Sequence, residues 1–139
     1  RTIETSNIII DELDFDRENV IIEDLLKEIS FGDFEGIPKP EIKKLYPEEE
    51  KKQSEDPWAY VYPNGESFSL VNERIKKLFE KYNLNDNYII VTHNGISRLI
   101  RGMLEGKNTK EIFELPYKNH EQNTVYAWDG KSMNKVNAV

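Results

Sequence analysis

The sequence predicts an α/β fold, in which strands and helices alternate along the chain. Residues 89–91, Ile-Ile-Val, form a continuous β-branched run of the kind that a strand covered on both faces requires. Residues 96–104 then carry apolar side chains at helical spacing, and a second stripe of the same period covers residues 68–82. A shorter β-branched run at residues 20–22 is another strand candidate. Strands that alternate with helices favour a layered α/β domain.

Length and composition restrict the class of protein. The chain has 139 residues, which suits one domain over residues 1–139. It has no cysteine and two histidines, which excludes thiolate chemistry and argues against a histidine-rich metal site. No apolar run reaches the length of a membrane span, and no signal peptide is visible. The formal charge of −7 argues against nucleic acid as the main partner. Without a membrane span or signal peptide, we expect a cytoplasmic protein that does not bind membranes.

The N-terminal part predicts a helix, a short strand and a glycine loop. Residues 1–10 are expected to be helical because Ile3 and Ile10 share a face with Asn7. An acidic loop then leads to the strand at residues 20–22. Residues 25–36 hold two glycines four apart, with Phe31 before the first and Phe34 between them, and we interpret this stretch as a structural turn. The chain begins with Arg1 rather than Met, and in mid-helix, so we expect that residues preceding Arg1 were removed or that the sequence is a fragment.

Residues 37–63 are expected to form an excursion that lies over the main body of the domain. They contain five of the six prolines, which forbid one long helix but allow short helices at residues 41–45 and 48–54. An alternating aromatic set follows, made of Trp58, Tyr60 and Tyr62. These rings either pack the excursion down or line a pocket, and we favour packing.

A turn at Gly65 precedes the helix predicted over residues 68–82. Its buried stripe is expected to include Val71, Ile75 and Leu78, which recur at spacings of three and four. Glu66 lies just before this helix. A carboxylate there is usually a favourable charge at the helix start, so position alone gives Glu66 no functional role.

His93 has the most informative position in the chain. It follows the strand predicted at residues 88–91 and precedes the helix that starts near Gly95. Open α/β sheets bind ligands at the carboxyl ends of their strands, and a helix N-terminus offers free N–H groups to an anion. A capping role and a functional role for His93 are equally compatible with this position.

The C-terminal part predicts a helix and a hairpin. Gly106 stops the preceding helix, and residues 109–113 suggest a short one. Residues 124–128 have the composition of a strand, and Asp129-Gly130 is a hairpin turn signal. The last residues, to Val139, are expected to pair back as an edge strand.

Taken together, these stretches resemble the histidine phosphatase superfamily, also called phosphoglycerate mutase-like, and its phosphatase branch in particular. Residues 1–6 are similar to the family's arginine-bearing helix start, and residues 28–36 to its glutamate, glycine and aromatic loop. Residues 65–67 are similar to the Gly-Glu-Ser motif, and residues 91–95 to the second-histidine motif. The resemblance covers nearly the whole chain. It implies a three-layer α/β/α sandwich around a mostly parallel sheet, with a helical insertion at about residues 37–63 over the active site.

The resemblance also implies a set of roles. In the family, a histidine attacks phosphorus and holds the phosphoryl group covalently, without metal or cofactor. By resemblance His93 is the second histidine of the phosphate pocket, Arg1 is a clamp arginine and Glu66 is the acid/base. The backbone at Asn94 and Gly95 is expected to donate to phosphate. Trp58 and Tyr62 are candidates for substrate contacts from the excursion.

One motif of the family does not occur in the sequence. The nucleophilic histidine belongs to an Arg-His-Gly segment on the first, central strand, and no Arg-His-Gly is present in residues 1–139. We expect this segment upstream of Arg1, and catalysis by residues 1–139 alone is uncertain without it. The leading hypothesis is a phosphomonoesterase acting on a small phosphorylated metabolite. The alternatives are a phosphomutase and a non-catalytic pseudo-phosphatase that binds a phosphorylated ligand or a protein partner. A homodimer is compatible with the sequence.

Overall fold

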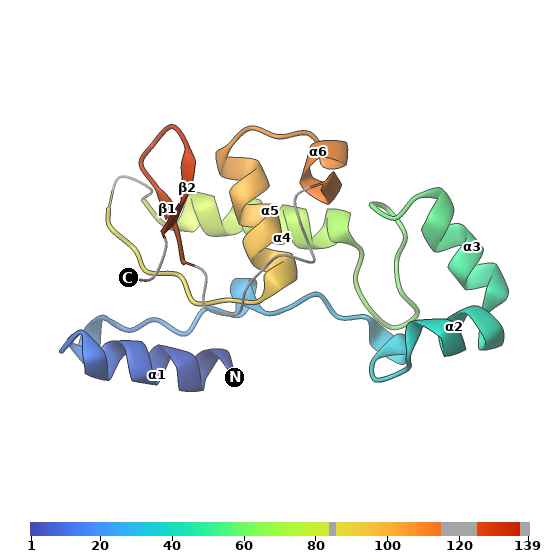
Figure 1. Cartoon of the computed structure of the whole chain (residues 1–139), viewed down its shortest axis with the longest axis horizontal. Helices are drawn as coiled ribbons and strands as arrows, with labels where there is room; N and C mark the ends of the chain where they lie inside the picture. The colour runs from blue at the N-terminus through green and yellow to red at the C-terminus, as the bar shows by residue number, and fades with distance from the viewer. Residues whose placement is uncertain (84–85, 115–124, 137–139) are drawn as a thin grey trace. The chain divides into compact units, whose positions relative to one another are not determined.

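The computed structural model describes residues 1–83, 86–114 and 125–136 (Figure 1). These residues form a mixed helix and strand structure. The helices are α1 (Thr2–Glu12), α2 (Lys39–Leu45), α3 (Pro47–Glu55), α4 (Phe68–Lys81), α5 (Asn94–Leu104) and α6 (Thr109–Glu114), the 3-10 turns are η1 (Arg17–Asn19), η2 (Asp24–Leu26) and η3 (Gly32–Phe34), and the strands are β1 (Val125–Trp128) and β2 (Met133–Val136). None of the helices described here is long and apolar enough to cross a membrane.

The described residues group into two compact units. The terminal unit comprises residues 1–28 and 78–139, and the middle unit comprises residues 29–77. Helix α4 contributes residues to both. Each unit has buried apolar side chains of its own. That residues 1–139 form one domain remains a prediction.

The middle unit is built around aromatic side chains. Tyr62 is buried, and its ring centroid lies 4.9 Å from that of Phe31, 6.0 Å from that of Phe34 and 5.1 Å from that of Tyr60. Val71 and Ile75, on the α4 stripe, are fully buried. The two short helices expected in the excursion are present as α2 and α3, and each has a proline in its first turn, where the missing N–H costs nothing.

Two glycine loops of the middle unit pack backbone against backbone. A Cβ atom on Gly32 would lie 2.0 Å from the carbonyl oxygen of Pro63, and a Cβ on Gly65 would lie 2.6 Å from that of Ser30. Gly32 also has a φ of +53°, which L side chains rarely adopt. The loop predicted as a structural turn therefore has a specific partner, the turn before α4, and only glycine fits at either contact.

The terminal unit packs α5 against α6 and the hairpin. Ile96, Leu99 and Ile100, from the predicted apolar stripe of α5, are buried. Gly102 on the same helix allows a close approach of α6, because a Cβ there would meet Ile112 Cγ1 at 2.3 Å. The Arg101 guanidinium lies over the Tyr126 ring, 3.8 Å from its centroid, and so joins α5 to β1.

Strands β1 and β2 form the antiparallel hairpin that the Asp129-Gly130 signal predicts (Figure 1). Val125 pairs with Val136 and Trp128 with Met133. The Asp129 carboxylate accepts hydrogen bonds from the backbone N–H groups of the turn, chiefly that of Ser132, and these bonds lower its pKa. Thr124 and residues 137–139, which the prediction included, lie outside the described residues.

The strands predicted at residues 20–22 and 88–91 are not formed. Neither stretch pairs with another described residue, and Ile89 and Ile90 are 65% and 44% exposed rather than buried. The physical reason is that a strand is stable only when its backbone pairs with a neighbouring strand, and neither stretch has such a pairing among the described residues. The two stretches instead border an apolar cleft of about 600 Å³ within the terminal unit, which Ile9, Leu13 and Phe79 also line. The mostly parallel sheet of a three-layer sandwich is therefore not seen among the described residues.

Candidate phosphate-binding site at the start of helix α5

His93 is the N-cap residue of α5. Its backbone is extended, with φ of −97° and ψ of 165°, and its carbonyl accepts the first helical hydrogen bond from Ser97 N at 2.8 Å. Its imidazole is half-buried and caps none of the helix N–H groups with a hydrogen bond. Just before it, Thr92 Oγ1 donates to the carbonyl oxygen of Leu26 at 2.9 Å. The imidazole is therefore held at the helix start without being used as its cap.

The first turn of α5 lies against the carboxylate of Glu28, for which the sequence predicted no functional role. A Cβ atom on Gly95 would lie 2.7 Å from Glu28 Oε1, so the Glu28 carboxylate packs directly on the backbone at Gly95. A negative charge is favourable at this end of a helix because the free N–H groups and the helix dipole point toward it. Glu28 and His93 thus both flank the N-terminus of α5.

Asn94 begins the helix itself. Its Oδ1 atom is buried and has no hydrogen-bond partner among the residues that the structure describes. A buried acceptor without a donor is costly and often marks a place where another group binds. The backbone N–H groups of Asn94 and Gly95 belong to the first turn, which has no intrahelical acceptors for them.

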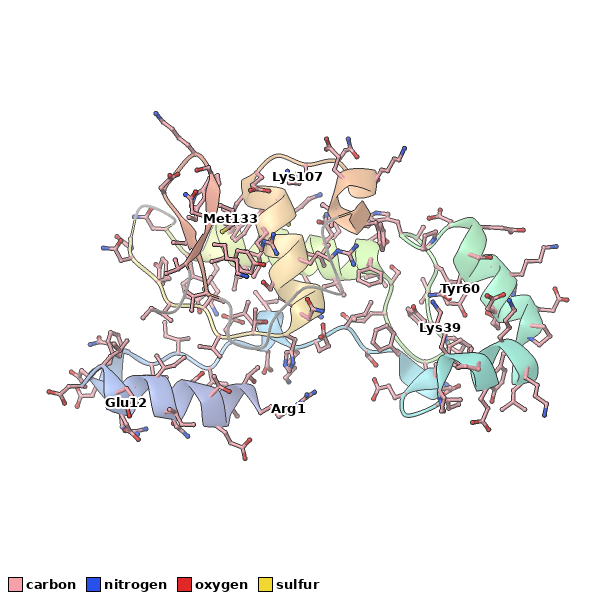
Figure 2. All side chains as sticks on the ribbon, in the orientation of Figure 1. Arg1, Glu12, Lys39, Tyr60, Lys107 and Met133 are labelled. Atoms are coloured by element: carbon pink, nitrogen blue, oxygen red, sulfur yellow. The ribbon has the colours of Figure 1, made fainter. Side chains whose placement is uncertain are left out.

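Arg1 is placed at the start of α1, where its side chain extends from the helix end (Figure 2). The side chain is 93% exposed, and the guanidinium contacts no carboxylate of the described chain. Its terminal ammonium group lies 3.5 Å from Glu4 Oε2. The structure does not bring Arg1 to the start of α5, and its role as a phosphate clamp remains a prediction.

Glu66 is held in the middle unit by three donors. Its carboxylate accepts hydrogen bonds from Arg74 Nε at 3.2 Å, from Arg74 Nη2 at 3.0 Å and from the backbone N–H of Ser30 at 3.0 Å. Its own backbone N–H donates to the Ser30 carbonyl at 2.8 Å, and its carbonyl accepts from Tyr62 N. The loop at Ser30 therefore holds the backbone of Glu66, and Ser30 together with Arg74 of α4 holds its carboxylate.

Two of the three aromatic residues of the excursion, Tyr60 and Tyr62, are buried in the middle unit. The Tyr62 hydroxyl accepts a hydrogen bond from Gln53 Nε2 at 2.9 Å, and its ring is buried in the aromatic cluster. Tyr60 lies beside α3, and its hydroxyl donates to Glu49 at 2.9 Å (Figure 2). Burial, and then this hydrogen bond, raise the pKa of Tyr60. Trp58 is half-buried and its carbonyl accepts from Ser69 N. Packing, the favoured alternative, is confirmed for the two tyrosines, whereas substrate contacts by Trp58 and Tyr62 remain predictions.

Glu23 is the centre of a second cluster of titratable side chains in the terminal unit. Glu23 accepts hydrogen bonds from Lys81 at 2.6 Å and from Tyr82 at 2.7 Å, and these bonds, with one from the Leu25 backbone, lower its pKa to about 2. This cluster ties the segment after η1 to the end of α4. Among residues 1–83, 86–114 and 125–136, no group of three or more His, Asp or Glu side chains has the arrangement of a metal site.

A helix that begins at a half-buried histidine, and whose first-turn N–H groups lack intrahelical acceptors, presents hydrogen-bond donors suited to an anion such as phosphate. The chain belongs to the histidine phosphatase superfamily (branch 1), whose family model matches residues 1–138.

The chain is also similar to parts of much longer proteins. The chain is 38% identical over 81 residues to 6-phosphofructo-2-kinase 1 of Saccharomyces cerevisiae. The aligned region covers 56% of this chain and 10% of that protein. It is 29% identical over 100 residues to the 6-phosphofructo-2-kinase/fructose-2,6-bisphosphatase of Gallus gallus, and equally to 6-phosphofructo-2-kinase/fructose-2,6-bisphosphatase 1 of Homo sapiens. In both cases the aligned region covers 72% of this chain and 21% of the relative. The chain thus spans between a tenth and about a fifth of the length of these relatives.

Proposed function

We propose that this chain is part of a phosphomonoesterase that acts through a phosphohistidine intermediate on a small phosphorylated metabolite. The observation that carries the proposal is the start of α5. There the half-buried His93 side chain makes no capping hydrogen bond, and the backbone N–H groups of Asn94 and Gly95 lie in the first turn. Membership of the histidine phosphatase superfamily supports phosphatase chemistry in general.

The proposed reaction has two transfers. An imidazole nitrogen of an Arg-His-Gly histidine, which residues 1–139 do not contain, forms a bond to phosphorus while the bond from phosphorus to the substrate oxygen breaks. A carboxylic acid donates its proton to the leaving oxygen, and the resulting carboxylate later accepts a proton from the water that cleaves the phosphohistidine. His93, Arg1 and the N–H groups of Asn94 and Gly95 would stabilise the charge on the phosphoryl oxygens.

Two carboxylates are candidates for the proton transfer. Glu66 is the residue that the motif resemblance favours, but its oxygens already accept three hydrogen bonds within the middle unit. Glu28 is favoured by geometry, because it lies at the same helix terminus as His93. We propose that Glu28 carries the proton and that Glu66 maintains the loop that follows Ser30. The alternative, proton transfer by Glu66, is tested in the same experiment.

The candidate substrate class is a phosphorylated sugar. Several relatives carry the name fructose-2,6-bisphosphatase, so fructose 2,6-bisphosphate is the first compound to test. A generic aryl phosphate tests the chemistry independently of substrate recognition. A phosphomutase would transfer the phosphoryl group to a second hydroxyl instead of water, and a pseudo-phosphatase would bind the compound without releasing phosphate.

The test uses the longest natural polypeptide that contains this chain. We expect phosphate release that survives a chelator, and a loss of about 100- to 1000-fold in His93→Ala, because one pre-organised charge donor is typically worth that much. Glu28→Gln should lower kcat by about 100-fold or more for substrates with a poor leaving group, since general acid catalysis contributes about that factor. It should also make kcat more dependent on the leaving-group pKa, because the leaving oxygen is no longer protonated as its bond to phosphorus breaks. Glu66→Gln should have a smaller effect, and the exposed Glu80→Gln is the matched control.

The outcomes separate the alternatives. Unchanged turnover in His93→Ala would refute the phosphate-pocket role. A greater loss in Glu66→Gln than in Glu28→Gln would return the proton transfer to Glu66. Binding of the sugar phosphate without phosphate release, in a polypeptide that contains the Arg-His-Gly segment, would favour the non-catalytic alternative. Light scattering on the same preparation would test the proposed homodimer.

A further inference from the structure

The turn at residues 62–65 presents an asparagine–glycine pair to solvent. Gly65 N donates to the Tyr62 carbonyl at 2.8 Å, and Asn64 has a φ of +54°. With Pro63 as the second residue, this is the geometry of a type II turn, in which asparagine accepts the left-handed position. Asn64 is exposed.

The side-chain amide of Asn64 is held by a carboxylate. Asn64 Nδ2 donates to Asp33 Oδ1 at 3.2 Å and to Asp33 Oδ2 at 3.0 Å, and all of these atoms are at the surface. The backbone N–H of Asp33 donates to the Pro63 carbonyl at 2.9 Å. These bonds join the turn to the glycine loop at Gly32, where the backbones are already in contact. The amide is thus both accessible to water and part of the contact between the two loops.

We propose that Asn64-Gly65 is a site of spontaneous deamidation, a modification that changes the contact with Asp33. The Gly65 amide nitrogen, which has lost its proton to hydroxide, attacks Asn64 Cγ. The new N–Cγ bond forms as the bond from Cγ to Nδ2 breaks, and Nδ2 leaves as ammonia after it takes a proton from water. Water then opens the cyclic imide at either carbonyl, which yields aspartate or isoaspartate. Glycine permits the attack because it has no Cβ to shield its nitrogen.

The chain contains a second asparagine–glycine pair, and its structure protects it. Asn94 and Gly95 lie in the first turn of α5, where the helix fixes the backbone between them. Gly95 is buried and Asn94 Oδ1 is inaccessible to water. The Glu28 carboxylate against Gly95 also opposes the loss of a proton from the Gly95 amide, because it places negative charge beside the anion that would form.

The predicted product introduces a like-charge contact. In place of an amide that donates to Asp33, residue 64 would carry a carboxylate within the same distance of the Asp33 oxygens. Two carboxylates in direct contact cannot both remain ionised without repulsion, so the two loops should separate locally. Glu66 lies two residues further along, and its backbone N–H donates to Ser30 across the same contact. Deamidation would therefore act on the loop that holds Glu66.

The test is peptide mapping of the folded chain after incubation in mildly alkaline buffer. We expect deamidation at Asn64 to be at least about tenfold faster than at Asn94, the ratio that corresponds to about 1.4 kcal/mol of difference in local opening. The same incubation in concentrated urea should bring the two rates together, since both pairs have the same local sequence chemistry once unfolded. Equal rates in the folded chain, or a faster reaction at Asn94, would overturn the proposal.

Two variants test the role of Asp33. Asp33→Asn should accelerate deamidation at Asn64, because the amide no longer has a carboxylate acceptor that holds it away from Gly65 N. Asn64→Asp should destabilise the folded chain, and adding Asp33→Asn should restore most of that loss. If Asn64→Asp costs the same with and without Asp33→Asn, the like-charge consequence is wrong. Asn64→Gln should remove the reactivity at this position, because its longer side chain forms the cyclic imide far more slowly.

Discussion

Arg98 provides the strongest test of how the terminal unit is held together. It is a buried guanidinium on α5, and it donates through Nε to the Ile112 carbonyl at 2.7 Å and through Nη2 to the Phe113 carbonyl. Its guanidinium carbon also lies 5.4 Å from the centroid of the Phe113 ring. These carbonyls belong to the last turn of α6, where intrahelical donors are absent. Arg98, on the neighbouring helix α5, therefore supplies the hydrogen-bond donors that the last carbonyls of α6 lack.

Arg98→Met keeps the aliphatic stem and removes both donors. A hydrogen bond to a charged group contributes about 1.5 to 3 kcal/mol, so the loss of two should cost about 3 to 6 kcal/mol in the free energy of unfolding. Arg98→Lys retains one donor and should lose roughly half as much. The measurement is urea unfolding followed by circular dichroism, with hydrogen exchange of the α6 amides as a local readout.

An exposed arginine supplies the matched control. Arg17 pairs with Asp11 at 2.5 Å, but both side chains are more than half exposed. Arg17→Met should therefore change the free energy of unfolding by about 0 to 1 kcal/mol. If Arg98→Met costs no more than Arg17→Met, the two carbonyls are satisfied in some other way and the argument for Arg98 is wrong.

Three further predictions concern packing and charge. Gly102→Ala should destabilise the chain, because overpacking costs about 1 to 3 kcal/mol and outweighs the better helix propensity; combining it with Ile112→Ala should remove the clash, and additive losses in this double-mutant cycle would contradict the contact. Ile75→Ala should cost about 2 to 5 kcal/mol in thermal unfolding, and a loss below 1 kcal/mol would mean that Ile75 is not in a packed core. The pKa of Glu23 is lowered chiefly by Lys81, so its stabilisation should be complete above the ordinary glutamate pKa and should fall as the pH drops toward about 2; Glu23→Gln should flatten that acid limb of the unfolding curve, and an unchanged limb would exclude the contribution.

The helices were predictable because their signals are local. The stripe on α4 and the stripe on α5 each specify which side chains are buried, and Val71, Ile75 and Leu99 are buried as expected. The hairpin turn at Asp129 also has a local signal, because the Asp129 carboxylate accepts hydrogen bonds from the backbone N–H groups of Lys131 and Ser132. A strand, in contrast, forms only when its backbone pairs with another strand. The strand predicted at residues 88–91 is not formed because a β-branched run favours an extended backbone but does not provide a partner strand.

The candidate site was predictable only in part, for a related reason. His93 could be assigned because its strand-like approach and its helix are adjacent in the sequence. The carboxylate of Glu28 reaches Gly95 across 67 positions of sequence, and no spacing rule connects them. The available signal was Gly95 itself, since a glycine in the first turn of a helix indicates that something approaches the backbone there closely.

The contact between the two glycine loops also bears on how this family can diversify. The excursion leaves the loop after Phe34 and returns at Pro63, and its ends are joined by the bond from Asp33 N to the Pro63 carbonyl. A closed loop of this kind can change in length at little cost, about 0.6 kcal/mol for each doubling, because closure entropy grows only slowly. The helices α2 and α3 could thus be exchanged for segments of other lengths while the chain around Gly65 and Glu66 keeps its geometry.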